Sequence, residues 1–181
     1  MHARIVKPKH GPEILVRPLR RGDTETVQAV FERLGEASRR ARFNGAKPRL
    51  GEQELRWLAA VDAKHHALVA YVDGDPEPVA IARFVRFGGS GEIAFEVADD
   101  YQGLGIGSAL TRELVADVRA AGVVEVTALV RSDNPAAFAL LRRVLGRLEV
   151  RVDGSETFVR ALLPGACWPA SGRVPSPVPP T

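Results

Sequence analysis

The sequence has few of the features that mark secreted, membrane or metal-binding proteins. Its 181 residues include a single cysteine, Cys167, which excludes an internal disulfide and any metal site built from several cysteines. No apolar run approaches the roughly 20 residues that span a bilayer. The first eight residues lack the apolar core of a signal peptide. We therefore expect a cytoplasmic protein with no membrane segment.

Charge of one sign is not in excess either. Lysine and arginine total 25 against 22 acidic residues, a net charge of +3, which does not indicate a nucleic-acid partner. The basic cluster at 39–42 (Arg-Arg-Ala-Arg) is predicted to be a solvated helix face, with contact to an acidic partner or a ribose phosphate as the alternative. His65 and His66 begin a predicted strand, and we predict no metal site.

The order of predicted elements indicates one α+β domain over residues 1–163, followed by a tail at 164–181 with six prolines in eighteen residues. Its core would be a mixed, mostly antiparallel sheet of six or seven strands flanked by helices. Periodicity and turn residues predict strands at 14–18, 67–72, 79–87, 92–98, 124–130, 147–152 and 157–163. Helices are predicted at 23–34, 36–43, 52–61 and 106–121, and from 135 onward.

Residues 97–108 (Val-Ala-Asp-Asp-Tyr-Gln-Gly-Leu-Gly-Ile-Gly-Ser) join a predicted strand to the long amphipathic helix. Glycines expose backbone N–H groups, and a helix start supplies further unpaired donors, so this loop is predicted to hold a phosphorylated cofactor. A P-loop is excluded because no lysine stands in it. A dinucleotide fingerprint would need a third glycine where Ser108 stands. A dinucleotide site and a simple turn that joins a strand to a helix remain as alternatives.

Residues 102–107, Gln-Gly-Leu-Gly-Ile-Gly, resemble the Q/R-x-x-G-x-G/A loop that binds the acyl-CoA diphosphate in the GNAT superfamily of N-acyltransferases. The order of elements also resembles the GNAT fold. The resemblance implies acetyl-CoA as acyl donor and a sheet that splays beside the strand ending at Val97. The cofactor-binding residues that it implies are Val97, Ala98, Gln102, Gly103, Leu104, Gly105, Ile106, Gly107, Ser108 and Asn134.

Two glutamates on the preceding strand, Glu92 and Glu96, share one face and are about 13 Å apart at strand rise, so one alone could act as a base. Residues 91–103 closely resemble the catalytic domain of bacterial Pat-type protein-lysine acetyltransferases, a similarity that extends over roughly 13–162. In that family the general base falls on Glu92. Many GNAT enzymes place a tyrosine acid where this chain has Leu141.

The resemblance implies transfer of an acetyl group from acetyl-CoA to a primary amine acceptor, and within the Pat type to a protein lysine. Acetylation of a small amine, such as an amino acid, polyamine or aminoglycoside, remains open. So does a non-catalytic module that only binds acyl-CoA. The sequence predicts no oligomeric state.

Overall fold

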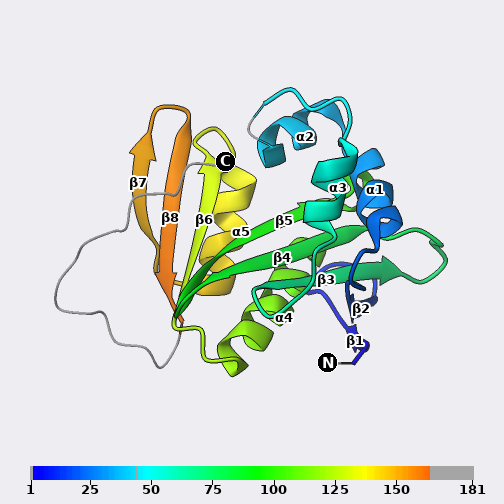
Figure 1. Ribbon diagram of the computed structural model, residues 1–181, viewed down its shortest axis with the longest axis horizontal. Coiled ribbons are helices and arrows are strands. Elements are labelled where there is room, and N and C mark those ends of the chain that lie inside the picture. Colours follow the sequence, from blue (N-terminus) through cyan, green and yellow to red (C-terminus); the bar gives the residue numbers. More distant parts are fainter. Residues whose placement is uncertain (1, 44, 164–181) are drawn as a thin grey trace.

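Eight strands form one mixed sheet in the computed structural model, which describes residues 2–43 and 45–163 (Figure 1). The spatial order is β1-β2-β3-β4-β5-β6-β8-β7, and only β5 and β6 run parallel. The strands are β1 (Arg4–Val6), β2 (Ile14–Pro18), β3 (His65–Val72), β4 (Ala80–Phe87), β5 (Ser90–Val97), β6 (Glu125–Arg131), β7 (Glu149–Asp153) and β8 (Glu156–Leu162). The α+β class is confirmed. The predicted tail at 164–181, with Cys167, lies outside the described residues.

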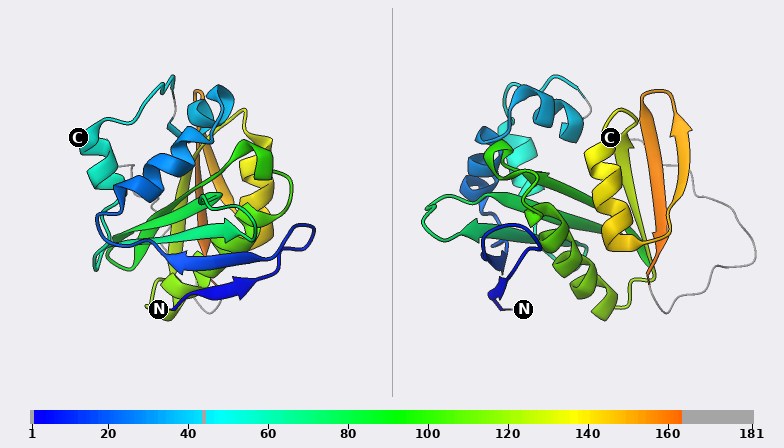
Figure 2. Two further views of the ribbon diagram at one scale, coloured as in Figure 1. Left: turned by 90° about the vertical axis from the view of Figure 1, so that its right-hand side faces the viewer. Right: turned by 180° about the vertical axis from the view of Figure 1, so that it is seen from behind.

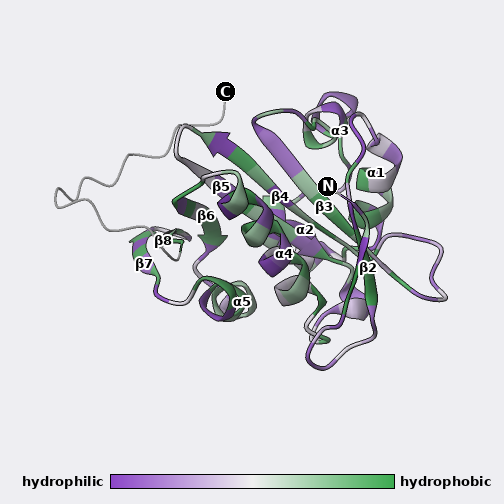
Figure 3. Cartoon of the chain, turned by 90° about the horizontal axis from the view of Figure 1, so that it is seen from below, coloured by the Kyte–Doolittle hydropathy of each residue, from purple (hydrophilic) through white to green (hydrophobic). Residues whose placement is uncertain are grey.

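Helices cover both faces of the sheet, and Figures 2 and 3 show α4 and α5 on the side opposite α1 and α3. Their bounds are α1 (Thr24–Glu32), α2 (Glu36–Phe43), α3 (Glu52–Leu58), α4 (Ile106–Ala120) and α5 (Pro135–Leu145), with a short 3-10 turn, η1 (Asp99–Tyr101), before α4. Each face has its own apolar core. None of the described helices has the length and hydropathy that a bilayer crossing requires.

Helix α4 follows the predicted apolar stripe, since Ile106, Leu110, Leu114 and Val118 are buried. Ala121, expected as a fifth member of the stripe, is exposed and lies just past the helix end. The following Gly122 has a positive φ of 81°, which a helix end commonly requires. The stripe therefore fixes α4 against the sheet, and with it the loop from which the helix starts.

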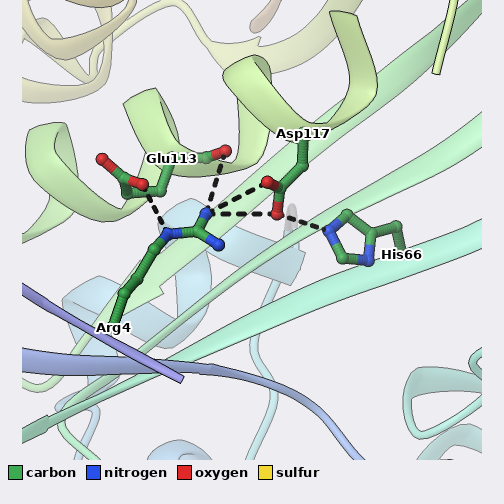
Figure 4. A network of polar contacts seen from close by, with 4 residues as sticks. All are labelled: Arg4, His66, Glu113 and Asp117. Atoms are coloured by element: carbon green, nitrogen blue, oxygen red, sulfur yellow. Dashed lines mark hydrogen bonds and ion pairs between the residues drawn. The ribbon is translucent and has the colours of Figure 1, made fainter. Parts of the chain in front are cut away.

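Strand β1 is the one that the sequence prediction missed. Three residues are too few to show an alternating pattern, and tertiary contacts hold them in place. Arg4 Nε donates to Glu113 Oε2 of α4 at 2.6 Å, and its Nη2 lies 3.2 Å from both carboxylate oxygens of Asp117 (Figure 4). His66 of β3 approaches the same aspartate at 3.1 Å. This network attaches both strands to α4.

The sheet opens between β5 and β6. The two strands pair only from Ser90 to Glu92, against Glu125 to Thr127, and then diverge, as Figure 1 shows. Beyond this point β5 stays paired with β4, and β6 with β8. Residues 93–97 of β5 therefore have no strand partner on one side, which is the splay that the resemblance implies.

Candidate active site

Two positions of the glycine loop have backbone conformations that only glycine adopts easily. Gly103 and Gly105 have φ values of 76° and 83°, in the left-handed region. No side chain caps the start of α4 at Gly105, so the first helical N–H groups keep their capacity to bind an anion. A Cβ on Gly107 would lie 3.0 Å from both Val97 and Leu140, so this glycine lets β5, α4 and α5 approach closely.

A cavity of about 920 Å³ occupies the splay and reaches the glycine loop. Its walls come from β5, the start of α4, β6, one side of α5 and, across the opening, α2. The structure brings most of the predicted site residues into this one lining: Glu92, Val97, Gln102, Gly103, Gly105, Ile106, Gly107, Ser108 and Asn134.

Two predicted residues, Ala98 and Leu104, do not line the cavity. Ala98 is buried, and its N–H donates to the Val79 carbonyl at 2.8 Å, so this amide is already used within the sheet. Leu104 packs against the larger core. The N-terminal segment approaches it so closely that a Cβ on Gly11 would lie 2.5 Å from the Leu104 carbonyl oxygen.

Glu92 lies where the splay begins, since it is the last residue of β5 that pairs with β6. Its side chain is exposed but sits in the cavity, where the surrounding protein displaces water. The loss of water around the carboxylate raises the pKa of Glu92, and the nearby charge of Arg42 opposes the rise. A carboxylate with a raised pKa that solvent and a ligand can both reach is suited to accept a proton.

Glu96 also faces the cavity, but its surroundings differ. Its side chain is only 6% exposed and forms ion pairs with Arg83 at 3.0 Å and Arg42 at 2.8 Å. Burial alone would raise the pKa of Glu96, but the two guanidinium groups outweigh burial and lower it. Arg83 also donates to the Leu58 carbonyl at the end of α3. Glu96 is therefore held as a structural anion.

The prediction that residues 39–42 form a solvated face is wrong for two of its arginines. Arg39 lies over the Phe31 ring, 4.3 Å from its centroid, and donates to the Pro48 carbonyl. Arg42 pairs with Glu96. Arg39 and Arg42 are three residues apart and therefore lie on one side of α2. That spacing is the feature of the sequence from which a protein-facing pair could have been predicted. Arg40 is exposed and lines the cavity.

The remaining polar candidates have structural partners. Asn134 caps α5, with its side chain accepting from the Ala137 N–H at 3.0 Å. Leu141, which stands where the resemblance would place a tyrosine acid, is fully buried. His65 and His66 each pair with a single aspartate. Over 2–43 and 45–163, no three His, Cys, Asp or Glu side chains are grouped to hold a metal ion.

The arrangement fits an acyl-CoA. The left-handed glycines and the uncapped start of α4 provide main-chain donors for a diphosphate, and the unpaired edge of β5 offers an extended segment beside the cavity. At the far end of that edge Glu92 supplies a carboxylate. A P-loop or a dinucleotide site would not need β5 and β6 to separate in this way.

Comparison with known proteins agrees with this geometry. Residues 29–146 match the model of the Acetyltransferase (GNAT) family. The chain is 37% identical over 153 residues to Acetyltransferase Pat of Mycolicibacterium smegmatis, covering 82% of this chain and 45% of that protein. It is 37% identical over 110 residues to Acetyltransferase PA5475 of Pseudomonas aeruginosa, covering 58% and 59%. The chain thus spans about half the length of these curated relatives.

Solved structures share the fold. The GNAT domain of S. lividans PAT superposes with a TM-score of 0.81 at 24% identity, covering 89% of this chain and 97% of that domain. A cAMP-binding acyltransferase from Mycobacterium smegmatis gives 0.64 at 28% identity, covering 90% and 47%. A PaiA N-acetyltransferase from Thermoplasma acidophilum in complex with coenzyme A gives 0.65 at 17% identity, covering 82% and 98%.

Proposed function

Because the chain belongs to the GNAT family of acetyltransferases, which use acetyl-CoA, we propose that it transfers an acetyl group to the side-chain amine of a protein lysine, with Glu92 as general base. The observation that carries the proposal is the position of Glu92. It lies in the same cavity as the glycine loop, at the opposite end of the unpaired edge of β5. A cofactor held by the loop and extended along that edge would reach this carboxylate.

Residues of the loop and of the helix start would hold the cofactor. Gln102 to Ser108 would bind the diphosphate through main-chain N–H groups, with Leu104 shaping the loop from behind. Val97 and Ala98 end the edge strand beside it, and Asn134 fixes the start of α5 along the cavity wall. Acetyl-CoA supplies the activated thioester when bound.

Glu92 would accept a proton from the acceptor. A lysine ammonium has a pKa of about 10.4 and must lose a proton before it can attack. A carboxylate whose pKa is raised towards the working pH takes that proton more effectively than an ordinary glutamate. Neither tyrosine of the chain lines the cavity, and Leu141 is buried, so we propose no tyrosine acid.

The charges around the cavity favour a protein lysine over a small polycation. A closed acidic pocket would be expected for a polyamine or an aminoglycoside. Here Glu96 is neutralised by two arginines and Asp133 by Arg131. That leaves Glu92 as the one acid of the described lining without an ion pair. An amine on a protein would gain its affinity from contacts outside the cavity.

Turnover of the full chain with labelled acetyl-CoA, offered peptides, small amines and a cell lysate, tests the proposal. Label on lysine side chains is expected. Glu92→Gln should lower kcat by about 100-fold or more, as for a lost general base, while calorimetry shows unchanged coenzyme A binding. Glu52→Gln, on an exposed helix start, is the matched control. Unchanged turnover by Glu92→Gln would remove this residue from the mechanism.

Other outcomes identify the alternatives. Label found only on small amines would mean a small-molecule acetyltransferase. Coenzyme A binding with no turnover on any acceptor would mean an acyl-CoA-binding module. Absence of nucleic-acid binding stays a prediction, which filter binding at two salt concentrations would check. The cytoplasmic location also stays a prediction.

A further inference from the structure

Helix α2, which forms one wall of the cavity, is held on the protein mainly by polar contacts. None of its residues from Glu36 to Phe43 is fully buried. One apolar contact that holds it is the edge-to-face pair of Phe43 and Phe31, with ring centroids 5.6 Å apart. An element with so little buried apolar surface depends on its remaining contacts for its position.

At its start, α2 is attached to the turn that precedes the glycine loop. Asp99 Oδ2 accepts a hydrogen bond from the Gly35 N–H at 3.1 Å, and the Asp99 N–H donates to the Arg33 carbonyl at 3.1 Å. The fit is close, since a Cβ on Gly35 would lie 2.5 Å from that carboxylate oxygen. A carboxylate at a helix start also suits the helix dipole.

Gln102, the first residue of the glycine loop, joins the same contact. Its Nε2 has three acceptors within hydrogen-bond distance, which share its two N–H groups: Asp99 Oδ1 at 3.1 Å, Ser38 Oγ of α2 at 3.0 Å and the Val97 carbonyl at 3.1 Å. The end of β5, the loop and the first turn of α2 therefore meet at one amide group. A change in the loop would be felt at α2 through this group.

At its other end α2 reaches the two glutamates. Arg42 pairs with Glu96 at 2.8 Å, and its charge acts on Glu92. The helix thus connects the loop that would hold the diphosphate to the carboxylate that would accept the proton. Its placement also sets the shape of the cavity on the acceptor side.

We propose that Asp99 is a positioning residue that couples occupancy of the glycine loop to the placement of α2. An anion bound at the loop holds Gln102 and Asp99 in place, and these hold the first turn of α2 through Gly35 and Ser38. By linkage, an ordered α2 strengthens binding at the loop by the same factor. The inference rests on the proposed function only in taking coenzyme A as the ligand of the loop.

Hydrogen exchange of the full chain, with and without coenzyme A, tests this coupling. The test variant is Asp99→Asn, which keeps the shape but leaves one acceptor oxygen where two donors now bind. Asp100→Asn is the matched control, because Asp100 is exposed and its side chain forms no hydrogen bond or ion pair with the described residues. Gly35→Ala disturbs the same contact from the side of the helix.

In the wild type and in Asp100→Asn, coenzyme A should slow exchange of the amides of residues 36–43 by about fivefold or more. Asp99→Asn and Gly35→Ala should lose most of this protection. Their KM for the acceptor should rise more than their kcat falls, because Glu92 is untouched. A general loss of stability would instead raise exchange throughout the chain, with and without ligand.

Two results would overturn the inference. Exchange of α2 that does not respond to coenzyme A in the wild type would show that no coupling exists. Full protection retained by Asp99→Asn would show that Asp99 does not carry it. In either case normal binding and turnover would leave the proposed function standing, whereas no calorimetric binding of coenzyme A to the wild type would contradict the proposed function itself.

Discussion

Replacing Glu96 by glutamine should destabilise the fold and largely spare the chemistry, whereas the same change at Glu92 should do the reverse. The two glutamates are four residues apart on β5 and both line the cavity. Glu96 is buried between two guanidinium groups, and one of them, Arg83, is only 7% exposed. Glu92 is exposed and makes no ion pair with the described residues. The same glutamate-to-glutamine substitution at the two positions therefore compares a buried, ion-paired carboxylate with an exposed, unpaired one.

The magnitude follows from the buried charges. Removing one partner of a buried ion pair costs about 3–5 kcal/mol, because the other charge stays buried without compensation. Arg42, at 18% exposure, can turn towards water, so we take the lower end for Glu96→Gln. At about 2–4 °C per kcal/mol for a domain of this size, Tm should fall by about 6–12 °C. Glu92→Gln, at an exposed position, should change stability by no more than about 0.5 kcal/mol.

Thermal denaturation followed by circular dichroism, with turnover measured well below Tm, distinguishes the two. Glu96→Gln should keep turnover within a few-fold of the wild type, while Glu92→Gln falls by about 100-fold. The double variant Arg83→Met/Glu96→Leu should recover much of the lost stability, since an apolar pair can replace a buried ion pair. The reasoning is refuted if Glu96→Gln melts within about 2 °C of the wild type, or if Glu92→Gln is the less stable of the two.

Further predictions concern pH, the loop and the N-terminal network. The pKa of Glu92 is raised, and a base works only when deprotonated, so kcat/KM should fall on acidification through a pKa above that of an ordinary glutamate. Arg42→Gln removes the positive charge that opposes this rise, so in a pH–rate profile the acidic fall in kcat/KM should move to higher pH. Gly107→Ala, crowded at 3.0 Å on two sides, should weaken coenzyme A binding in calorimetry and also lower Tm, because the added methyl group pushes α4 away from β5 and α5. Asp117→Asn removes one of the carboxylates that Arg4 contacts and should lower the free energy of unfolding by about 1 kcal/mol in a denaturant titration, without altering coenzyme A binding. A clear loss of coenzyme A affinity in this variant would contradict the view that the Arg4 network serves stability alone.

Much of the architecture was predictable because its signals are local. The apolar stripe of α4 and the apolar runs between turn residues that predicted β3 to β5 can each be read within one element, and these elements are confirmed. Strand β1 was not predictable, because its Arg4 is held by Glu113 of α4, more than a hundred residues further along the chain. Likewise Arg39 and Arg42 look solvated in the sequence, and their partners come from other elements.

The sequence by itself determined that residues 97–108 join a strand to a helix through closely spaced glycines, because main-chain conformation at a glycine depends on that residue and its neighbours. It also placed two glutamates on one face of the strand, by the period of two. Only the tertiary structure shows how the surroundings of the two carboxylates differ. Whether a carboxylate is buried among arginines or reachable in a cavity depends on side chains from β4 and α2, which the chain brings together only when it folds.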